Sequence, residues 1–214
     1  NTVSYESGFK RFGNPECRLG LVLNIRLPPM DIDMSDVDEF EDDRAVNSAY
    51  YSPDGKFIIS SCSECSTASA YDIGFVHLWD ASTGAYIDKL TAHRGGACCA
   101  NFSRTGSLIV TSGCDASARV WDATTLKLEG IFKGKSDQRH KGYVWDVDTS
   151  PDETLLLTAS DDGFVNIWDI KTREILAHLP HKGPVNMARF SPIENKIIAG
   201  CDDGYAYLWP FSRS

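Results

Sequence analysis

Histidine, serine and aspartate recur together along this chain of 214 residues, and this combination of side chains could support nucleophilic catalysis. The fullest set is His140, Ser160 and Asp162. A nucleophilic serine must be exposed and activated by a neighbouring histidine. Similar sets recur around His93 and His181, however, and each ends on a tryptophan, which catalysis does not require. The recurrence favours a structural role, so we expect no catalytic residues and no enzyme activity.

Cysteine is the other residue type whose spacing could indicate chemistry. Among seven cysteines, Cys62 and Cys65 form one C-x-x-C, and Cys98 and Cys99 are adjacent. A zinc site usually takes four ligands from two such pairs, but there is neither a second C-x-x-C nor a histidine pair at zinc-finger spacing. A Gly-rich phosphate loop is absent as well. We therefore expect free thiols in a reducing compartment, no metal and no other cofactor.

The composition is that of an ordinary globular protein, with 42% hydrophobic and 24% charged residues. No stretch approaches the roughly 18 apolar residues of a membrane helix, so we expect no membrane insertion. The net charge of −9 argues against non-specific binding of nucleic acid. A local basic strip, Lys10, Arg11, Arg18 and Arg26, could still contact RNA inside a complex.

The elements that must position these residues repeat along the chain. Four similar sequence segments each contain a tryptophan near their end, and these tryptophans are spaced by 42, 47 and 41 residues: Trp79, Trp121, Trp168 and Trp209. Turn residues and β-rich runs precede each tryptophan, and 161–163 (Asp-Asp-Gly) is a strong hairpin signal. No segment has a helical period. The pattern predicts an all-β chain whose repeats are four-stranded blades.

In these four tryptophan-containing segments the chain resembles WD40-repeat proteins, which are β-propellers. The resemblance covers about residues 44–210 and implies four recognisable blades at about 44–90, 91–132, 133–179 and 180–210, within a repeat region of 44–214. An N-terminal extension, 1–43, would hold a strand at 21–27 that closes the last blade and an acidic loop at 28–43.

Four blades form a partial or small propeller, because WD40 propellers usually have about seven. Three alternatives remain for the ring. A longer chain supplies further blades, a partner or a second copy supplies them, or four blades close alone.

The resemblance also implies a hydrogen-bonded chain inside each blade, from a histidine through a hydroxyl and an aspartate to the tryptophan. By repeat, these residues are His93, Asp115 and Trp121; His140, Ser160, Asp162 and Trp168; and His181, Asp203 and Trp209. Gly113 and Cys201 stand at the hydroxyl position of the second and fourth repeats. We therefore expect the third blade, with its complete set, to be the most rigid.

Partner binding in this family tends to use the face where the loops at the blade starts gather around the central channel. The resemblance places seven residues there: Asn47, Cys98, Cys114, Trp145, Asp161, Asn186 and Asp202. Trp145 beside Asp161 could stack on, and pair with, an arginine or lysine side chain. The alternative is that Trp145 packs on a neighbouring blade.

The leading hypothesis is a non-catalytic scaffold, a subunit of a larger intracellular complex in the cytoplasm or nucleus, whose partners are other proteins. A second hypothesis is a reader of short basic peptides centred on Trp145. A third is an RNA-contacting subunit of a ribonucleoprotein assembly, against which the net charge counts.

Overall fold

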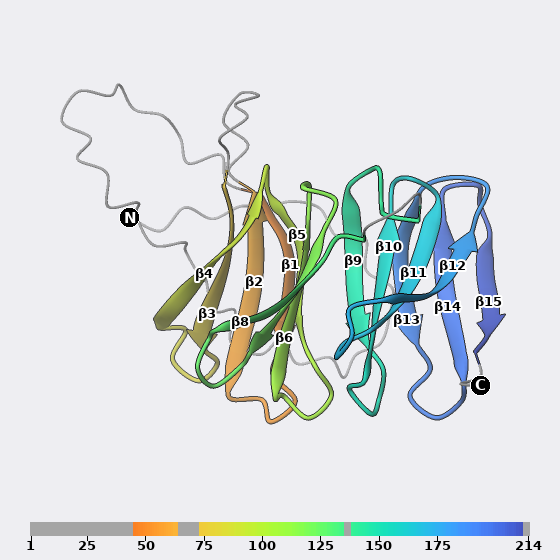
Figure 1. The fold of residues 1–214 in the computed structure, drawn as a ribbon. Helices are drawn as coiled ribbons and strands as arrows, with labels where there is room; N and C mark the ends of the chain where they lie inside the picture. Colours follow the sequence, from red (N-terminus) through yellow and green to blue (C-terminus); the bar gives the residue numbers. More distant parts are fainter. Residues whose placement is uncertain (1–44, 64–72, 135–137, 212–214) are drawn as a thin grey trace, which may run out of the picture.

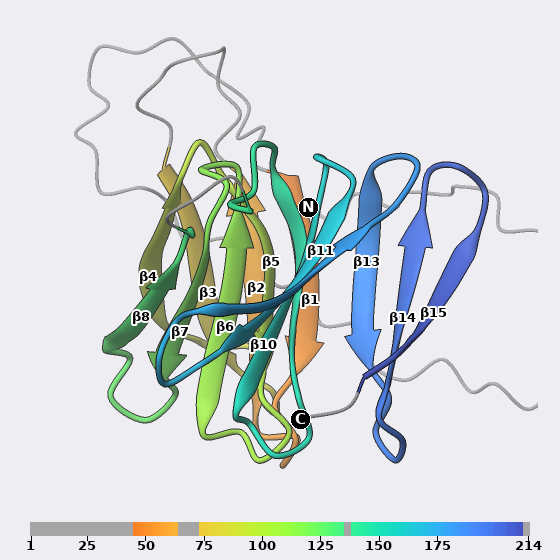
Figure 2. The same ribbon diagram turned by 45° about the vertical axis from the view of Figure 1, so that its right-hand side comes forward.

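The computed structural model describes residues 45–63, 73–134 and 138–211. All regular elements in this part of the chain are β-strands, which confirms the all-β prediction. They form four antiparallel sheets that follow one another in sequence order (Figures 1 and 2). The expected closing strand at 21–27 and acidic loop at 28–43 lie outside the described residues. Within the described ranges, no helix is present that could cross a membrane.

Each sheet is a blade whose strands pair in chain order. Blade one contains β1 (Ala45–Tyr51), β2 (Phe57–Ser63), β3 (Ile73–Asp80) and β4 (Tyr86–Arg94). Blade two contains β5 (Ala97–Phe102), β6 (Leu108–Gly113), β7 (Ala118–Asp122) and β8 (Leu128–Phe132). Blade three contains β9 (Val144–Thr149), β10 (Leu155–Ser160), β11 (Phe164–Asp169) and β12 (Ile175–Pro180). The described strands of blade four are β13 (Val185–Phe190), β14 (Lys196–Cys201) and β15 (Ala206–Pro210).

The same serine-based turn connects the first two strands of the first three blades. The hydroxyl of Ser52 accepts the backbone N–H of Phe57 at 2.9 Å, and Ser150 accepts that of Leu155 at 3.0 Å. Ser103 makes the equivalent bond. A serine hydroxyl can replace a backbone partner in a tight turn, so this residue fixes where each second strand begins.

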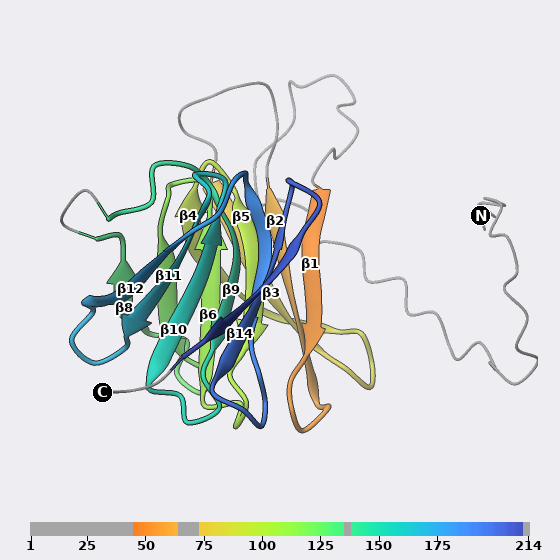
Figure 3. The same cartoon turned by 90° about the vertical axis from the view of Figure 1, so that its right-hand side faces the viewer.

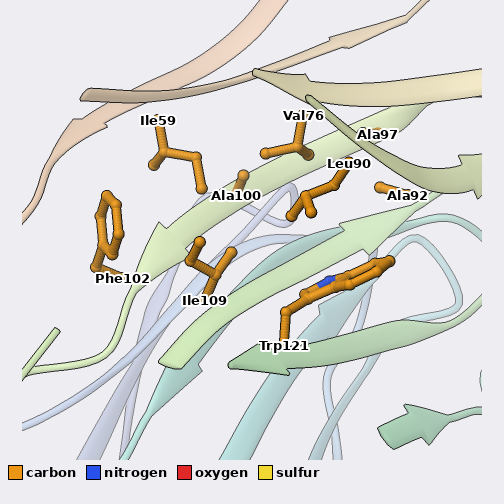
Figure 4. Packing of buried hydrophobic residues seen from close by; sticks show 9 residues of the cluster. All are labelled: Ile59, Val76, Leu90, Ala92, Ala97, Ala100, Phe102, Ile109 and Trp121. Atoms are coloured by element: carbon orange, nitrogen blue, oxygen red, sulfur yellow. The ribbon is translucent and has the colours of Figure 1, made fainter. Parts of the chain in front are cut away.

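The hydrophobic core lies between adjacent blades rather than within them. In the first cluster, Ile59, Val76 and Leu90 of blade one face Ile109 and Trp121 of blade two (Figure 4). Equivalent clusters join blade two to blade three and blade three to blade four. Because each blade buries its apolar faces on its neighbours, an isolated blade would expose most of its core.

A charged contact joins the innermost strands. The carboxylate of Asp146 in β9 accepts the backbone N–H of Ala188 at 3.0 Å and pairs with the guanidinium of Arg189 in β13. Arg189 also donates to the hydroxyl of Tyr50 in β1 at 3.1 Å. These bonds tie blade three to blade four, and blade four to blade one.

Candidate interaction surfaces

A buried hydroxyl links histidine and tryptophan in blade three. Thr158 Oγ1 accepts the indole N–H of Trp168 at 2.9 Å and lies 2.7 Å from His140 Nε2. The other ring nitrogen of His140 lies 3.1 Å from a carboxylate oxygen of Asp162. With a proton on Nδ1, donors and acceptors alternate from the indole through the hydroxyl and the imidazole to the carboxylate.

Blade two contains the same arrangement. Thr111 Oγ1 accepts the indole N–H of Trp121 at 3.1 Å and lies 2.8 Å from His93 Nε2. His93 Nδ1 lies 2.9 Å from a carboxylate oxygen of Asp115. In blade one, Ser60 accepts the indole N–H of Trp79 at 2.9 Å.

The hydroxyl position expected from the sequence was wrong by two residues. Ser160 does not join His140 to Trp168; its hydroxyl accepts the backbone N–H of Asp162 at 3.2 Å. Strand side chains alternate with period two, so Thr158 and Ser160 share a face and the pattern cannot separate them. The distance along the chain would have helped, because Thr158 lies ten residues before its tryptophan, as does the hydroxyl residue of blade two.

Gly113 is therefore no defect in blade two. A Cβ at this position would lie 2.4 Å from Cγ of His93, so the glycine makes room for the imidazole. Because blades two and three both have a complete histidine–hydroxyl–tryptophan chain, the expectation that blade three alone is complete has no basis.

Blade four differs from the others. Ala199 occupies the position of the missing hydroxyl, and Trp209 donates directly to His181 Nε2 at 3.1 Å. His181 Nδ1 in turn donates to the carbonyl of Leu179 at 3.1 Å. Asp203 accepts the Tyr207 hydroxyl instead, at 2.5 Å, and this bond raises the pKa of Tyr207 to about 12.

Burial and hydrogen bonds together set the ionisation of these networks. Burial lowers the pKa of His93 below its ordinary value, although the neighbouring Asp115 opposes the shift. Burial alone would raise the pKa of Asp115, but hydrogen bonds from His93 and Ser117 outweigh it and the pKa falls to about 2. The carboxylate is thus held ionised as an acceptor, which suits a structural role.

The groups that resemble catalytic sets are closed to solvent. Thr158 and His140 are buried, and so are Cys62 and His77, whose Sγ and Nδ1 atoms lie 3.7 Å apart. A nucleophile needs contact with its substrate, so neither pair can act in this conformation. In the described ranges, no cluster of three or more histidine, cysteine, aspartate or glutamate side chains could hold a metal ion.

The seven residues expected to bind partners lie where the innermost strands begin and at the turns after the second strands; we call this the strand-head surface. Asn47 donates across to the carbonyl of Ala97 in blade two at 2.8 Å. Asn186 donates to Asp202 at 2.5 Å. The remaining predicted residues are Cys98 and Cys114, whose sulfur atoms lie 3.7 Å apart, and the pair Trp145 and Asp161.

Trp145 lies at this surface with a second aromatic ring. Its indole contacts Tyr143 edge to face, with ring centroids 5.5 Å apart, and the two side chains are 38% and 47% exposed. Asp161 is exposed, and its backbone N–H binds the carbonyl of Tyr143 at 2.9 Å. Two aromatic side chains and a carboxylate thus belong to one small region of blade three. Sequence reasoning missed Tyr143, which lies just before β9.

The outer face of blade four was also missed, and it is open. Ile198 pairs with Leu208 across β14 and β15, and they are 52% and 62% exposed. The matching pair in blade three, Leu157 and Ile167, is 0% and 1% exposed because blade four covers it. Met187 extends the open face along β13. In Figure 3, blade four is turned toward the viewer.

Comparison with known proteins agrees with this architecture. The family model for the WD domain, G-beta repeat, matches residues 36–72, 84–122, 133–169 and 173–210. These matches cover more than half of the sequence. The chain belongs to the WD40-repeat family.

Its relatives have varied names. Autophagy-related protein 16 of Arabidopsis thaliana is 25% identical over 63% of this chain and 26% of its own length. Periodic tryptophan protein 2 homolog of Neurospora crassa is 30% identical over 58% of this chain and 13% of its own length. Eukaryotic translation initiation factor 3 subunit I of Caenorhabditis elegans is 32% identical over 45% of this chain and 28% of its own length. The chain thus matches less than a third of the length of these relatives.

Proposed function

We propose that this chain is a non-catalytic scaffold that joins other proteins in a larger intracellular complex. The open face of blade four is the observation that carries the proposal. Contiguous exposed apolar residues on a folded protein mark interaction sites, because water contact with them is unfavourable. The described blades bury their facing sides on each other in three clusters, whereas none of these clusters includes Ile198 or Leu208, so this face is available for association. A relative named as a subunit of a translation initiation factor supports the same class of function.

The partner we propose for the open face is another β-sheet. Ile198 and Leu208 occupy the positions that Leu157 and Ile167 use to pack on a following blade. A sheet from a partner protein, from a second copy or from a longer form of this chain would bury them in the same manner. Such a contact adds a sheet to the series of four blades and requires no catalytic group.

The test compares a charged substitution on this face with a matched one elsewhere. In Leu208→Lys the charge enters the open face, whereas in Leu176→Lys it enters the exposed edge strand β12 of blade three, where the side chain is 53% exposed. We expect association of the wild-type chain, measured by light scattering and by cross-linking in extract, and we expect Leu208→Lys alone to abolish it. A wild-type monomer of 23.6 kDa without cross-linked partners would contradict the proposal.

We propose a second function for blade three, the reading of short basic peptides. Tyr143 and Trp145 are both partly exposed, and Asp161 supplies a negative charge in the same region. An arginine or lysine that stacks on an aromatic ring gains about 0.5–1 kcal/mol at an exposed site, so each contact is weak and several must combine. The basic strip considered for RNA, Lys10, Arg11, Arg18 and Arg26, lies outside the described residues.

Tryptophan fluorescence can follow this binding, because Trp145 is exposed while Trp79, Trp121 and Trp168 are buried and Trp209 is half-buried. We expect an arginine-containing peptide to change the fluorescence in the micromolar to millimolar range. Trp145→Phe should retain weak binding in a calorimetric titration and Trp145→Ala should lose it. Equal affinity in Trp145→Ala and wild type would exclude this site while leaving the open face of blade four untouched.

A further inference from the structure

Two cysteines of blade two face each other at the strand-head surface. The Sγ atoms of Cys98 and Cys114 lie 3.7 Å apart, and the two residues come from β5 and from the turn after β6. The pairing of these strands explains the placement. Ala97 is opposite Gly113, and the register shifts between Ala97 and Cys99, so Cys98 is the bulged residue. A bulge redirects a side chain, in this case toward Cys114.

The same two positions converge in blade four, which is an independent observation of the geometry. There Asn186 and Asp202 take the places of the two cysteines, and their side chains hydrogen-bond at 2.5 Å. Side chains at these positions therefore come into direct contact in two blades. A disulfide needs its sulfur atoms about 2 Å apart, so the two sulfur atoms must approach each other from 3.7 Å to form one.

We propose that Cys98 and Cys114 form a reactive dithiol that small-molecule disulfides oxidise to an intramolecular disulfide. Cys114 differs from the other described cysteines in accessibility, whereas its partner Cys98 is buried. Cys114 is half-buried and reachable from solvent, whereas Cys62 and Cys99 are buried. Cys201 is also buried, and its thiol bonds to the carbonyl of Gly183. Reaction at thiols requires access to the attacking sulfur.

The local environment also designates which sulfur attacks. A hydrogen bond from the Cys98 thiol lowers the pKa of Cys114, so Cys114 is the thiol of the pair that loses its proton more readily. By contrast, burial raises the pKa of Cys99 to about 12, which keeps that neighbour protonated. Since the thiolate is the nucleophile in exchange reactions, Cys114 reacts first and Cys98 resolves.

The reaction balances as two exchanges. The Cys114 thiolate attacks one sulfur of a small disulfide such as glutathione disulfide, forms a mixed disulfide and releases one glutathione thiolate. The Cys98 thiol then loses its proton, attacks the Cys114 sulfur and releases the second glutathione. The protein loses two electrons and two protons, and one disulfide molecule becomes two thiols. A reductant such as dithiothreitol returns the disulfide to two thiols and is itself oxidised.

The product would link the start of β5 to the turn that holds Asp115. It would sit among the residues of the strand-head surface, so oxidation would alter this surface next to the buried network of blade two. Oxidation of Cys98 and Cys114 does not require the proposed scaffold function. The disulfide is detected in the chain itself, with no partner protein present.

Peptide mapping of the full chain tests the proposal. Trypsin cuts after Arg94, Arg104 and Arg119, which places Cys98 and Cys114 on different peptides, 95–104 and 105–119. After incubation with glutathione disulfide and alkylation of the remaining thiols, we expect the two peptides to be joined and to separate on reduction. Cys99 shares a peptide with Cys98, so the Cys99→Ala variant identifies the linked sulfur.

The variants distinguish the expected result from its failure. Cys99→Ala should form the cross-link as the wild type does. Cys98→Ser should stop at a glutathione adduct on Cys114, and Cys114→Ser should give neither product. A stable adduct on Cys114 in the wild-type chain, a link that needs Cys99, or two unmodified thiols after treatment would each overturn the proposal. Circular dichroism of the variants verifies that they are folded.

Discussion

Removal of the Thr158 hydroxyl should destabilise the protein strongly, although the substitution hardly changes the shape of the core. Thr158→Val leaves the indole N–H of Trp168 and the Nε2 atom of His140 without their partner. All three side chains are buried, so water cannot replace the hydroxyl. An unsatisfied buried polar group costs about 1–3 kcal/mol, so two such groups give an expected loss of about 2–6 kcal/mol.

The control substitution is Ser160→Ala on the same strand. It removes only the bond to the backbone N–H of Asp162, for which we expect a loss of about 1 kcal/mol. Urea unfolding followed by tryptophan fluorescence gives both free energies of unfolding. If Ser160→Ala were as costly as Thr158→Val, the assignment of Thr158 as the connecting hydroxyl would be refuted.

Three further predictions concern steric fit, pH and charge. Gly113→Ser, which would restore the hydroxyl of the expected pattern, should instead lower the free energy of unfolding by about 1–3 kcal/mol because its Cβ meets His93; unchanged urea midpoints would contradict this. Burial lowers the pKa of His93 below its unfolded value of 6.5, so stability should be full above pH 6.5 and fall as the pH drops below it. Urea midpoints at pH 8 and 5.5 test this, and His93→Gln should reduce the difference between them without abolishing it, because burial also lowers the pKa of His178 and His181. Asp146→Ala leaves Arg189 without its buried partner and should cost about 3–5 kcal/mol in chemical denaturation, more than alanine at the exposed Asp152.

The sequence alone identified the repeats and their order. The four tryptophans, the serine turns and the alternating runs are local signals, and each depends on residues close together in the chain. Those signals were sufficient for an all-β chain built of blades, and the family comparison agrees. The end of blade one was less well predicted, because β4 continues past residue 90 to Arg94 by pairing with β3.

The details of the networks needed the tertiary structure. Thr158 and Ser160 face the same side of β10, and only the position of His140 across the blade decides which hydroxyl lies within 2.7 Å. For the same reason, the sequence did not show that Trp209 donates directly to His181. In that blade Ala199 stands at the hydroxyl position and offers no partner to the indole.

The sequence determined which residues each blade contains, because strand periodicity and turn chemistry act over a few residues. Only the tertiary structure decided what those residues contact. Ile198 and Leu157 belong to similar runs, yet one is exposed and the other buried, since burial depends on whether a neighbouring blade is present. Likewise, a bulge in β5 brings Cys98 to Cys114, and no pattern along the chain shows that contact.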